Sequence, residues 1–460
     1  MLIRFVVKNL FSFKEETEFN LLPSKSQRLN HHKYQKNGIE VLKMTALYGA
    51  NGSGKSNLVK ALLLFRRMLT TGVIPIQLSN QKFKLCETTQ NEPVELAIEF
   101  SVNDRTYYYS ASVDKGIIIG EYFSYNDENQ EDMLIFHREY KNKKTKITFN
   151  DNFEKSVANQ VLKNIIEKDF LKSNQPLFTL LNTITNDAFD DIKNAFLWLS
   201  KGLIILFPFT RINKLANFIS TNTDFSNNLM SSFNTGISQL KVEEKTLEEF
   251  FGKNNQKEID EIKYEAQNNI NKFFLKTIEK NGEKFDITNN KGNIKVQRLF
   301  LEHKGENDEN IAFKVNEESD GTQRLLEYLP VFYSLICTNK TIIIDEIERS
   351  IHPIIIKEII SKFSEDTKTE GQLIFTTHEF NLLDQEIFRQ DEIWFAEKKL
   401  GATKLSPLSN FKENAAISLD KGYLAGRYGG IPFIGDLQNL NWHKFDEENL
   451  ENQKLNNNVE

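Results

Sequence analysis

The sequence has little of what marks several protein classes. It contains two cysteines, Cys86 and Cys337, among 460 residues, which excludes a disulfide framework and a cysteine-rich zinc site. We interpret both as thiols in a reducing compartment. Its apolar runs, such as Gly202–Phe209, are far shorter than the roughly 20 residues of a membrane-spanning helix, and the first residues lack the apolar core of a signal peptide. We therefore expect a cytoplasmic protein with no membrane partner.

An excess of basic charge is also missing. The 58 lysines and arginines face 64 acidic residues, which gives a net charge of −6. This balance excludes a basic footprint for nucleic acid over the whole chain. The lysine-rich stretch Lys141–Lys146 is a local exception, and a solvated hairpin is its simpler interpretation. A nucleic-acid partner therefore stays open.

Apolar segments typical of strands occur in both the first and the last third of the chain, and helical patterns accompany them. The predicted strands are Leu2–Val7, Val41–Tyr48, Val94–Phe100, Thr106–Val113, Met133–Phe136, Thr341–Ile344, Leu373–Thr376 and Ile393–Ala396. Those between 94 and 136 alternate as in an antiparallel sheet, whereas Thr341–Ile344 is apolar throughout, as in a buried central strand. From about Glu154 to Asn281 helical patterns dominate, and the charged stretch Glu243–Glu279 predicts one or two long helices.

The most specific motif is Gly49–Ser56, which fits the phosphate-loop pattern G-x-x-x-x-G-K-[ST] in full. Glycines allow the loop to turn its N–H groups toward phosphate oxygens, and the following helix offers its N-terminal dipole to the anion. The motif lies between a predicted strand and a predicted helix, as this chemistry requires. The expected nucleotide-binding residues are Asn51, Gly52, Ser53, Gly54, Lys55, Ser56 and Asn57.

Two acids end the apolar strand Thr341–Ile344. Asp345 fits the carboxylate that helps to hold Mg²⁺ together with the Ser56 hydroxyl, and Glu346 fits the base that activates the attacking water. A pair of acids that merely ends a strand in solvent is the alternative. The phosphate loop elsewhere in the chain makes the catalytic interpretation the stronger one, so ATP and Mg²⁺ are the expected substrate and cofactor.

A third block, Glu318–Arg324, precedes an apolar helix at Leu325–Ile336. It resembles the signature motif of ABC-type ATPases, Leu-Ser-Gly-Gly-Gln, in which the helix start of one subunit contacts nucleotide held by another. Ser319, Gly321 and Gln323 fit the motif, whereas Glu318 and Asp320 depart from it. An ordinary capped helix is the alternative.

His378 follows the strand Leu373–Thr376 and resembles the switch histidine that contacts the γ-phosphate, so we expect it to be catalytic with Glu346. His352 lies in the segment Glu348–Pro353 and is expected to fix that loop rather than to act in catalysis. The glutamine that would link Mg²⁺ to the middle of the domain could be Gln77 or Gln81, and the sequence does not choose between them.

Together these blocks resemble the AAA15-like family of ABC-type ATPases, in the group of the OLD and SMC-like proteins and near the Rlo/AbiL-type phage-defence ATPases. Further support comes from Leu10–Phe13, Asp345–Pro353 and Gly422–Pro432. The resemblance implies an ATPase that closes its site with a second copy, as a homodimer or higher oligomer. It also implies a separately encoded effector protein. The Asp-x-Asp motif of the Toprim nuclease that OLD proteins carry is missing after Asp345, so we expect no built-in nuclease.

The fold expected is therefore α/β, with an ABC-type phosphate-loop core, an antiparallel β subdomain and a large, mainly helical insertion. We expect the first part of the core in residues 1–150, the insertion in 151–290, the second part of the core in 291–435, and a polar tail in 436–460. Alternative functions are an SMC-like ATPase acting on DNA, an ATP-binding scaffold that restrains a toxin, a transporter ATPase and a small-GTPase-like switch. The last lacks an Asn-Lys-x-Asp guanine motif, since Asn339-Lys-Thr-Ile has no Asp.

Overall fold

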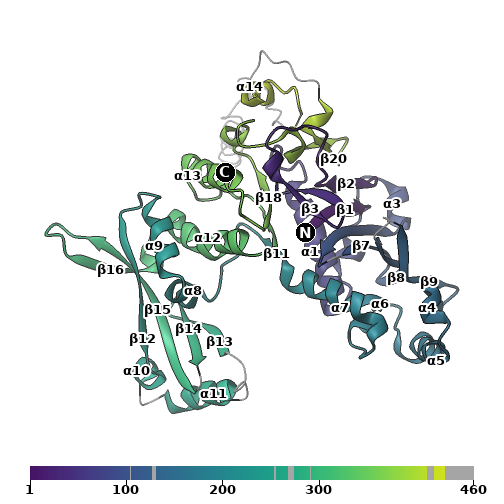
Figure 1. The fold of residues 1–460 in the computed structure, drawn as a ribbon, viewed down its shortest axis with the longest axis horizontal. Helices are drawn as coiled ribbons and strands as arrows, with labels where there is room; N and C mark the ends of the chain where they lie inside the picture. Colours follow the sequence, from purple (N-terminus) through teal and green to yellow (C-terminus); the bar gives the residue numbers. More distant parts are fainter. Residues whose placement is uncertain are drawn as a thin grey trace, which may run out of the picture.

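The structure is a computed structural model that describes residues 1–103, 105–126, 131–252, 255–267, 274–290, 292–411 and 419–429. The expected tail at 436–460 lies outside these residues. Figure 1 shows three regions: a sheet with α4 and α5 at one end, a sheet with α10 and α11 at the other, and α12 and α13 between them. Helices and strands mix throughout, which confirms the α/β class.

The central sheet has six strands, and its first five are parallel. In spatial order they are β11 (Leu203–Leu206), β17 (Thr341–Ile344), β18 (Gln372–Thr377), β5 (Met44–Tyr48) and β19 (Ile393–Lys399), with β20 (Ala402–Pro407) antiparallel at the edge. The sheet thus joins three stretches of chain that are far apart in sequence. Because the strands are parallel, the loops after β5, β17 and β18 meet at one edge.

Side chains of the central sheet alternate between two cores. Ile343 and Ile374 face a core that contains α1 (Lys55–Thr71), and Ile342, Ile344 and Phe375 face a core that contains α12 (Asp320–Cys337) and α13 (Pro353–Glu365). This alternation follows from the two-residue period of a strand. The helix after the phosphate loop and the helix of the signature block therefore cover opposite faces of the sheet.

A seven-stranded antiparallel sheet covers the α1 side and shares its core. Its spatial order is β10 (Lys144–Phe149), β9 (Asp132–Lys141), β8 (Ile117–Asn126), β7 (Arg105–Asp114), β6 (Val94–Val102), β1 (Leu2–Lys8) and β2 (Thr17–Asn20). The sequence predicted β1, β6, β7 and β9 but not β2, β8 and β10, and Gly120 weakens the strand pattern of β8. The short helices of this region are α2 (Gln77–Asn80), α3 (Glu87–Asn91), α4 (Asp151–Glu154), α5 (Val157–Ile165), α6 (Leu177–Asn182) and α7 (Asp190–Leu197).

The third sheet is formed by β12 (Ile237–Lys245), β15 (Asn293–Lys304), β14 (Glu283–Asn290) and β13 (Phe274–Lys280), and β16 (Asn310–Lys314) also pairs with β15. Its helices are α8 (Leu215–Thr221), α9 (Thr223–Ser231), α10 (Leu247–Phe251) and α11 (Gln256–Gln267). The prediction of one or two long helices at Glu243–Glu279 holds only for the middle of that stretch, where α10 and α11 lie, because β12 and β13 occupy both ends. The apolar residues of β13 pack against a separate small core that includes Phe285 and Val296, whereas Ile237 and Leu240 of β12 belong to the core that contains α12.

The expected insertion at 151–290 is rich in helix, but it is not one unit. Residues Phe153, Leu177 and Trp198 belong to the core shared by α1 and the seven-stranded sheet. Strand β11 then joins the central sheet beside β17, and only the chain after it builds the third sheet. No helix in the described ranges is long and apolar enough to cross a membrane.

The predicted strand Val41–Tyr48 is divided into β4 (Ile39–Leu42) and β5, and β4 pairs with β3 (Lys33–Lys36). The division falls at Lys43, whose buried ammonium donates to the carbonyl groups of Phe363 at 2.6 Å and Ser364 at 3.3 Å. This contact ties the start of β5 to the end of α13. Burial lowers the pKa of Lys43 to about 8.

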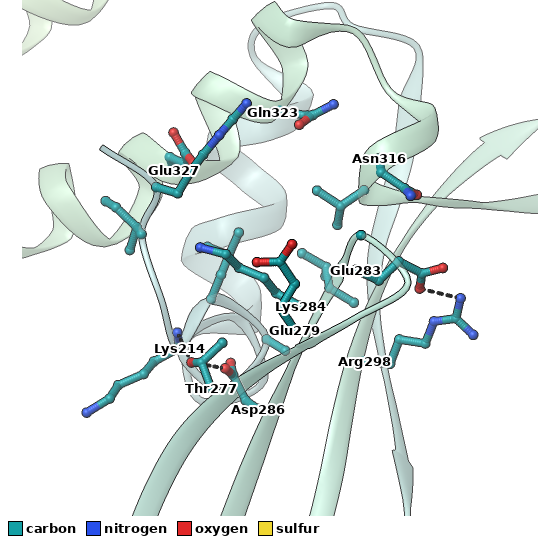
Figure 2. Close-up of a pocket in the computed structure, with 17 residues that line it drawn as sticks. Lys214, Thr277, Glu279, Glu283, Lys284, Asp286, Arg298, Asn316, Gln323 and Glu327 are labelled. Atoms are coloured by element: carbon teal, nitrogen blue, oxygen red, sulfur yellow. Dashed lines mark hydrogen bonds and ion pairs between the residues drawn. The ribbon is translucent and has the colours of Figure 1, made fainter. Parts of the chain in front are cut away.

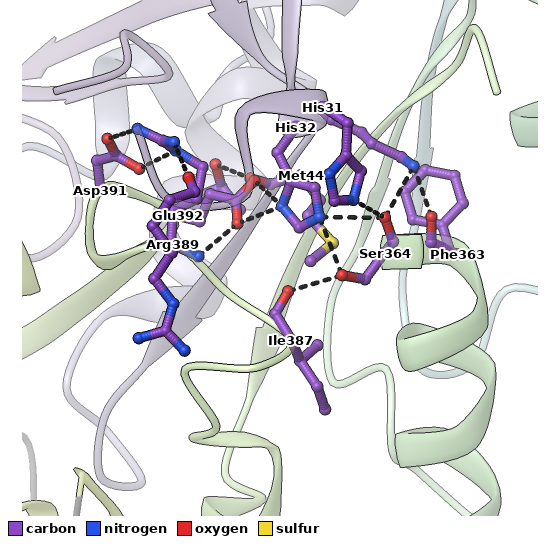
Figure 3. A network of polar contacts seen from close by, with 12 residues as sticks. His31, His32, Met44, Phe363, Ser364, Ile387, Arg389, Asp391 and Glu392 are labelled. Atoms are coloured by element: carbon purple, nitrogen blue, oxygen red, sulfur yellow. Dashed lines mark hydrogen bonds and ion pairs between the residues drawn. The ribbon is translucent and has the colours of Figure 1, made fainter. Parts of the chain in front are cut away.

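A polar network continues from Ser364 and fixes the segment before β5 (Figure 3). His32 and Glu392 are fully buried, with His32 Nδ1 2.9 Å from a Glu392 carboxylate oxygen. His32 Nε2 lies 2.9 Å from the Ser364 hydroxyl, which donates to the carbonyl of Ile387 at 2.8 Å. Each of these buried groups has partners, as a stabilising network requires. The network thus connects the segment before β3 with the end of α13 and with Glu392, which directly precedes β19 of the central sheet.

Candidate nucleotide site

The phosphate loop lies between β5 and α1, as the sequence predicted. Gly52 and Gly54 have φ values of 78° and 109°, a backbone region that glycine enters without strain. A Cβ atom on Gly54 would lie 2.1 Å from the Thr403 hydroxyl oxygen, so the position also requires glycine for space. Asn51 and Gly52 are exposed at the tip of the loop, and Ser53 is buried beneath it.

Two residues that the sequence analysis did not propose for the site, Ser12 and Thr403, make hydrogen bonds that support this loop. Thr403 on β20 donates from its hydroxyl to the carbonyl of Ser53 at 2.8 Å and lies 2.7 Å from the Ser12 hydroxyl. Asn57, expected to bind nucleotide, donates to the same Ser12 oxygen at 2.9 Å. Ser12 lies in the Leu10–Phe13 segment, so that segment contributes a loop support.

Lys55 is buried at the centre of the loop. Its ammonium donates to the carbonyl groups of Gly49 at 2.6 Å and Ala50 at 3.2 Å. Burial lowers its pKa from the ordinary 10.5 to about 8, although the acids Glu348 and Asp345 act in the opposite direction. The ammonium therefore sits in a partly desolvated position where a phosphate would be a strong partner.

Asp345 ends β17 directly beside the first turn of α1. The Ser56 hydroxyl donates to its carboxylate at 3.1 Å, and the Thr376 hydroxyl donates to the same oxygen at 2.6 Å. Mg²⁺ is commonly held by one or two protein oxygens together with substrate phosphates. Ser56 and Asp345 fit that role, and no group of three or more metal-ligating side chains occurs among the described residues.

Glu346 follows with a left-handed backbone, φ 52°, which is uncommon outside glycine. Its N–H donates to the Thr376 hydroxyl at 2.8 Å, and its carboxylate lies 3.4 Å from Arg349. The Arg349 guanidinium lies 3.9 Å from the ring centre of Phe209, a side chain that is 76% exposed. Neither Arg349 nor Phe209 was singled out in the sequence.

His378 follows β18 and meets the phosphate loop. Its Nδ1 lies 3.1 Å from the Gly49 carbonyl and 3.2 Å from the Lys55 ammonium, so it donates to the first when protonated and accepts from the second when not. Its backbone N–H donates to Glu348 at 2.7 Å. The structure thus brings His378, Lys55, Ser56, Asp345 and Glu346 to one edge of the central sheet.

The signature block does not join this group within the chain. Ser319 caps α12 by accepting the N–H of Thr322 at 3.2 Å, and the Gln323 amide donates to the carbonyl of Glu318 at 2.8 Å. Ser319 is exposed at the start of the helix. A Cβ atom on Gly321 would lie 2.7 Å from the Ser350 carbonyl oxygen, which places this turn against the loop that follows Glu346.

The remaining sequence candidates take structural positions. His352 caps α13 by accepting the N–H of Ile354 at 3.3 Å, in line with a role in fixing that loop. Gln77 is exposed on α2, and Gln81 follows it, with its carbonyl accepting the N–H of Phe11 at 2.7 Å. The lysines of Lys141–Lys146 belong to the solvated hairpin between β9 and β10.

Residues 44–384 match the family described as "AAA domain, putative AbiEii toxin, Type IV TA system". This range contains the phosphate loop, α12, both acids after β17 and His378. No curated protein matches the chain.

Three solved structures of SMC heads resemble the chain. A crystal structure of the SmcHead bound to the C-winged helix domain of ScpA is 14% identical, covers 92% of this chain and 99% of that one, and has a TM-score of 0.41. The SMC head domain from Thermotoga maritima is 11% identical, with coverages of 88% and 98% and a TM-score of 0.34. The Smc head domain with an extended coiled coil bound to the C-terminal domain of ScpA, derived from Pyrococcus furiosus, is 15% identical, with coverages of 93% and 98% and a TM-score of 0.34.

Proposed function

The chain belongs to this AAA-domain family of nucleotide-binding ATPases, and from that premise we propose that it hydrolyses ATP as an ABC-type switch in which two copies close on the nucleotide. The observation that carries the proposal is the cluster at the edge of the central sheet. There the buried Lys55 lies at the loop, Ser56 bonds to Asp345, and Glu346 and His378 stand beside them.

Each residue in the cluster has a chemical role in this proposal. The loop N–H groups and Lys55 bind the phosphates. Ser56 and Asp345 would hold Mg²⁺, which would supply positive charge beside the transferred phosphoryl group. Glu346 orients and deprotonates the attacking water, and His378 contacts the γ-phosphate. These are the roles predicted from the sequence, and the distances above support them.

The separation of the two motifs supports closure between copies. Because α1 and α12 cover opposite faces of the sheet, Ser319 of a chain is poorly placed to reach the phosphate loop of the same chain. The exposed start of α12, with Ser319, Gly321 and Gln323, is available to a second copy. Nucleotide would then hold the interface, and hydrolysis would release it.

We further propose that this switch acts on a separately encoded partner in bacterial anti-phage defence. The family description, which names a putative AbiEii toxin and a Type IV TA system, supports this role, because such systems consist of a toxin and an antitoxin. An SMC-like role on DNA is the alternative, and the acidic net charge does not favour it.

The test compares Glu346→Gln and Lys55→Ala with the parent chain by ATP turnover and by light scattering after gel filtration. Glu346→Gln is expected to lower turnover by about a hundredfold or more, since general bases contribute about that much, and to accumulate an ATP-dependent dimer. Lys55→Ala is expected to bind no ATP and to stay in the nucleotide-free state. Parental turnover in Glu346→Gln would show that Glu346 is not the base.

A further inference from the structure

A cavity of about 250 Å³ lies between the third sheet and α12, on the side of the molecule away from the seven-stranded sheet. It forms where the ladder of β15 is interrupted. On this side β14 pairs with β15 as far as Gln297, and β16 pairs with it from Phe300. Arg298 and Leu299 lie between these two ladders, and both line the cavity. The cavity is thus built into the sheet by the departure of β14.

Two acids of the cavity wall are paired with arginines, and a third accepts a hydrogen bond from a neutral hydroxyl. Figure 2 shows two of these pairs as dashed lines, one on each side of the cavity. The pairs are Glu283 with Arg298, Glu327 with Arg324 at 3.1 Å, and Asp286 with the hydroxyl of Thr277 at 2.6 Å. The two ion pairs therefore leave little negative charge at Glu283 and Glu327 for a ligand to meet.

The exposed charged residues at the rim of the cavity are mostly cations. Arg211, Lys214 and Lys284 are exposed cations of the lining, and Glu279 is its exposed acid. Lys284 donates to the amide oxygen of Asn213 at 2.9 Å, and Glu279 is its cross-strand neighbour in the β13–β14 pair. Arg211 lies 3.4 Å from Glu327, a long contact for a side chain that is half exposed. Among the exposed charged residues of the lining, three cations therefore stand against one acid.

The floor of the cavity is apolar. Leu215, Ala216 and Leu299 line it, and Ala216 and Leu299 are buried. A pocket with an apolar floor and a few charged groups at its mouth is the usual form of a small-molecule site. The volume lies near the lower end of the range for such sites, which favours a compact ligand.

We propose that this cavity binds a small anion that carries an apolar group, and that the ligand regulates the nucleotide site. The acidic group would meet Lys284 and Arg211 at the rim, and the apolar group would cover Leu299 and its neighbours. The regulatory half of this proposal rests on the proposed ATPase function, whereas the binding half does not.

The proposed regulation of the nucleotide site follows from the residues that line the cavity. Gln323 and Glu327 line the cavity from α12, the helix that Ser319 caps (Figure 2). A ligand in contact with them bears directly on the first turns of the signature helix. Its occupancy therefore changes how the start of α12 meets a second copy.

The segment after β11 also lines the cavity, and it contacts the residues around Asp345 and Glu346. Arg211 belongs to the segment that follows β11, and the carbonyl of Leu206 at the end of β11 accepts the N–H of Asp345 at 2.8 Å. Phe209 in the same segment stacks on Arg349, which pairs with Glu346. The cavity is thus lined by a short segment that contacts Asp345 through Leu206 and the Arg349–Glu346 pair through Phe209.

The binding test uses the full-length Lys55→Ala chain, so that the phosphate loop does not contribute. The probe is 8-anilinonaphthalene-1-sulfonate, an anion with an apolar body, and the comparison compound is the uncharged N-phenyl-1-naphthylamine. In fluorescence titrations we expect the sulfonate to bind more tightly than the amine. Lys284→Glu, added to this chain, should weaken sulfonate binding by about tenfold, because it replaces an attraction by a repulsion.

Lys257→Glu on α11 is the matched control, since it makes the same charge change at an exposed position outside the cavity lining. It should leave the affinity for the sulfonate unchanged. Equal affinity for the two compounds, or equal weakening by Lys257→Glu and Lys284→Glu, would overturn the anion site.

The regulatory test measures ATP turnover in the chain with Lys55 intact. A saturating concentration of the sulfonate should change kcat severalfold relative to the same chain without the probe, and Lys284→Glu should abolish this response. Binding at the cavity with no change in kcat would overturn the regulatory half alone. A chain that binds the probe but never hydrolyses ATP would refute the proposed function and leave the binding site standing.

Discussion

The phosphate loop and the start of α12 are both candidate anion-binding turns at helix starts, but the chain builds them very differently. The loop is tied from three distant segments, through Ser12, Thr403 and Asp345. The start of α12 is capped by its own Ser319, which stays exposed. In the proposed mechanism, one chain therefore completes only the first half of the site, and the start of α12 would serve the site of a second copy.

The largest loss of ATP affinity is expected from a substitution inside the phosphate loop. Gly54→Ala places a methyl group 2.1 Å from the Thr403 hydroxyl at a left-handed φ of 109°. The strain and the overlap together amount to a few kcal/mol, so ATP affinity should fall by about a hundredfold. Isothermal calorimetry measures this loss. Gly52→Ala is the control, since its Cβ would meet nothing within 4 Å, and an equal loss there would argue against the steric cause.

Gly321→Ala should separate the two halves. Its methyl group would lie 2.7 Å from the Ser350 carbonyl, so the start of α12 must move, while the phosphate loop is untouched. ATP affinity of the isolated chain should stay at the parental level, and turnover should fall by about tenfold, the effect of roughly 1.4 kcal/mol on the transition state. A parallel loss of ATP binding would show that α12 contributes to the site of its own chain.

The buried lysine of the loop predicts a pH dependence that α12 cannot produce. Below pH 8 the Lys55 ammonium is already charged, whereas above pH 8 the free protein must take up a proton to pair with a phosphate. ATP affinity should therefore fall by about tenfold between pH 7 and pH 9. Calorimetry at pH 9 in two buffers of different ionisation enthalpy should detect the uptake. Lys55→Arg should bind without it, and a proton uptake that persists would assign the effect to another group.

The smallest effect concerns the support beneath the loop. Thr403→Ala removes the hydroxyl that donates to the Ser53 carbonyl, at a cost of about 1 kcal/mol, so ATP affinity should fall by about fivefold. Thr403→Ser keeps the hydroxyl and should restore most of the affinity. Equal losses in the two variants would show that the methyl group, rather than the hydrogen bond, supports the loop.

The sequence located the parts of the site that are contiguous. Gly49–Ser56 carries its chemistry in one stretch, and Asp345 and Glu346 end a strand whose apolar run is unmistakable. It missed Thr403 and Ser12, because a lone hydroxyl residue has no pattern and acquires its role only when β20 lies against the loop. Arg349 and Phe209 were missed for the same reason, since they meet only across two separate segments.

The third sheet shows where sequence patterns fail. The strongly charged stretch Glu243–Glu279 was expected to form one or two long helices, yet only its middle is helical, in α10 and α11, and β12 and β13 form its ends. Their backbone groups are satisfied by pairing with β15 and β14, which come later in the chain. Such non-local pairing overrides a local preference that is worth only fractions of a kcal/mol per residue.

The phosphate loop, the strand with its two acids and the α/β class could therefore be predicted from the sequence, because short-range geometry and apolar periodicity are enough to specify them. Three features became visible in the tertiary structure alone: β11 completes the central sheet, α1 and α12 cover opposite faces of it, and a cavity opens between β14 and β16. Those features depend on which distant segments bury each other's apolar faces, and that choice is made by the packing of the whole chain.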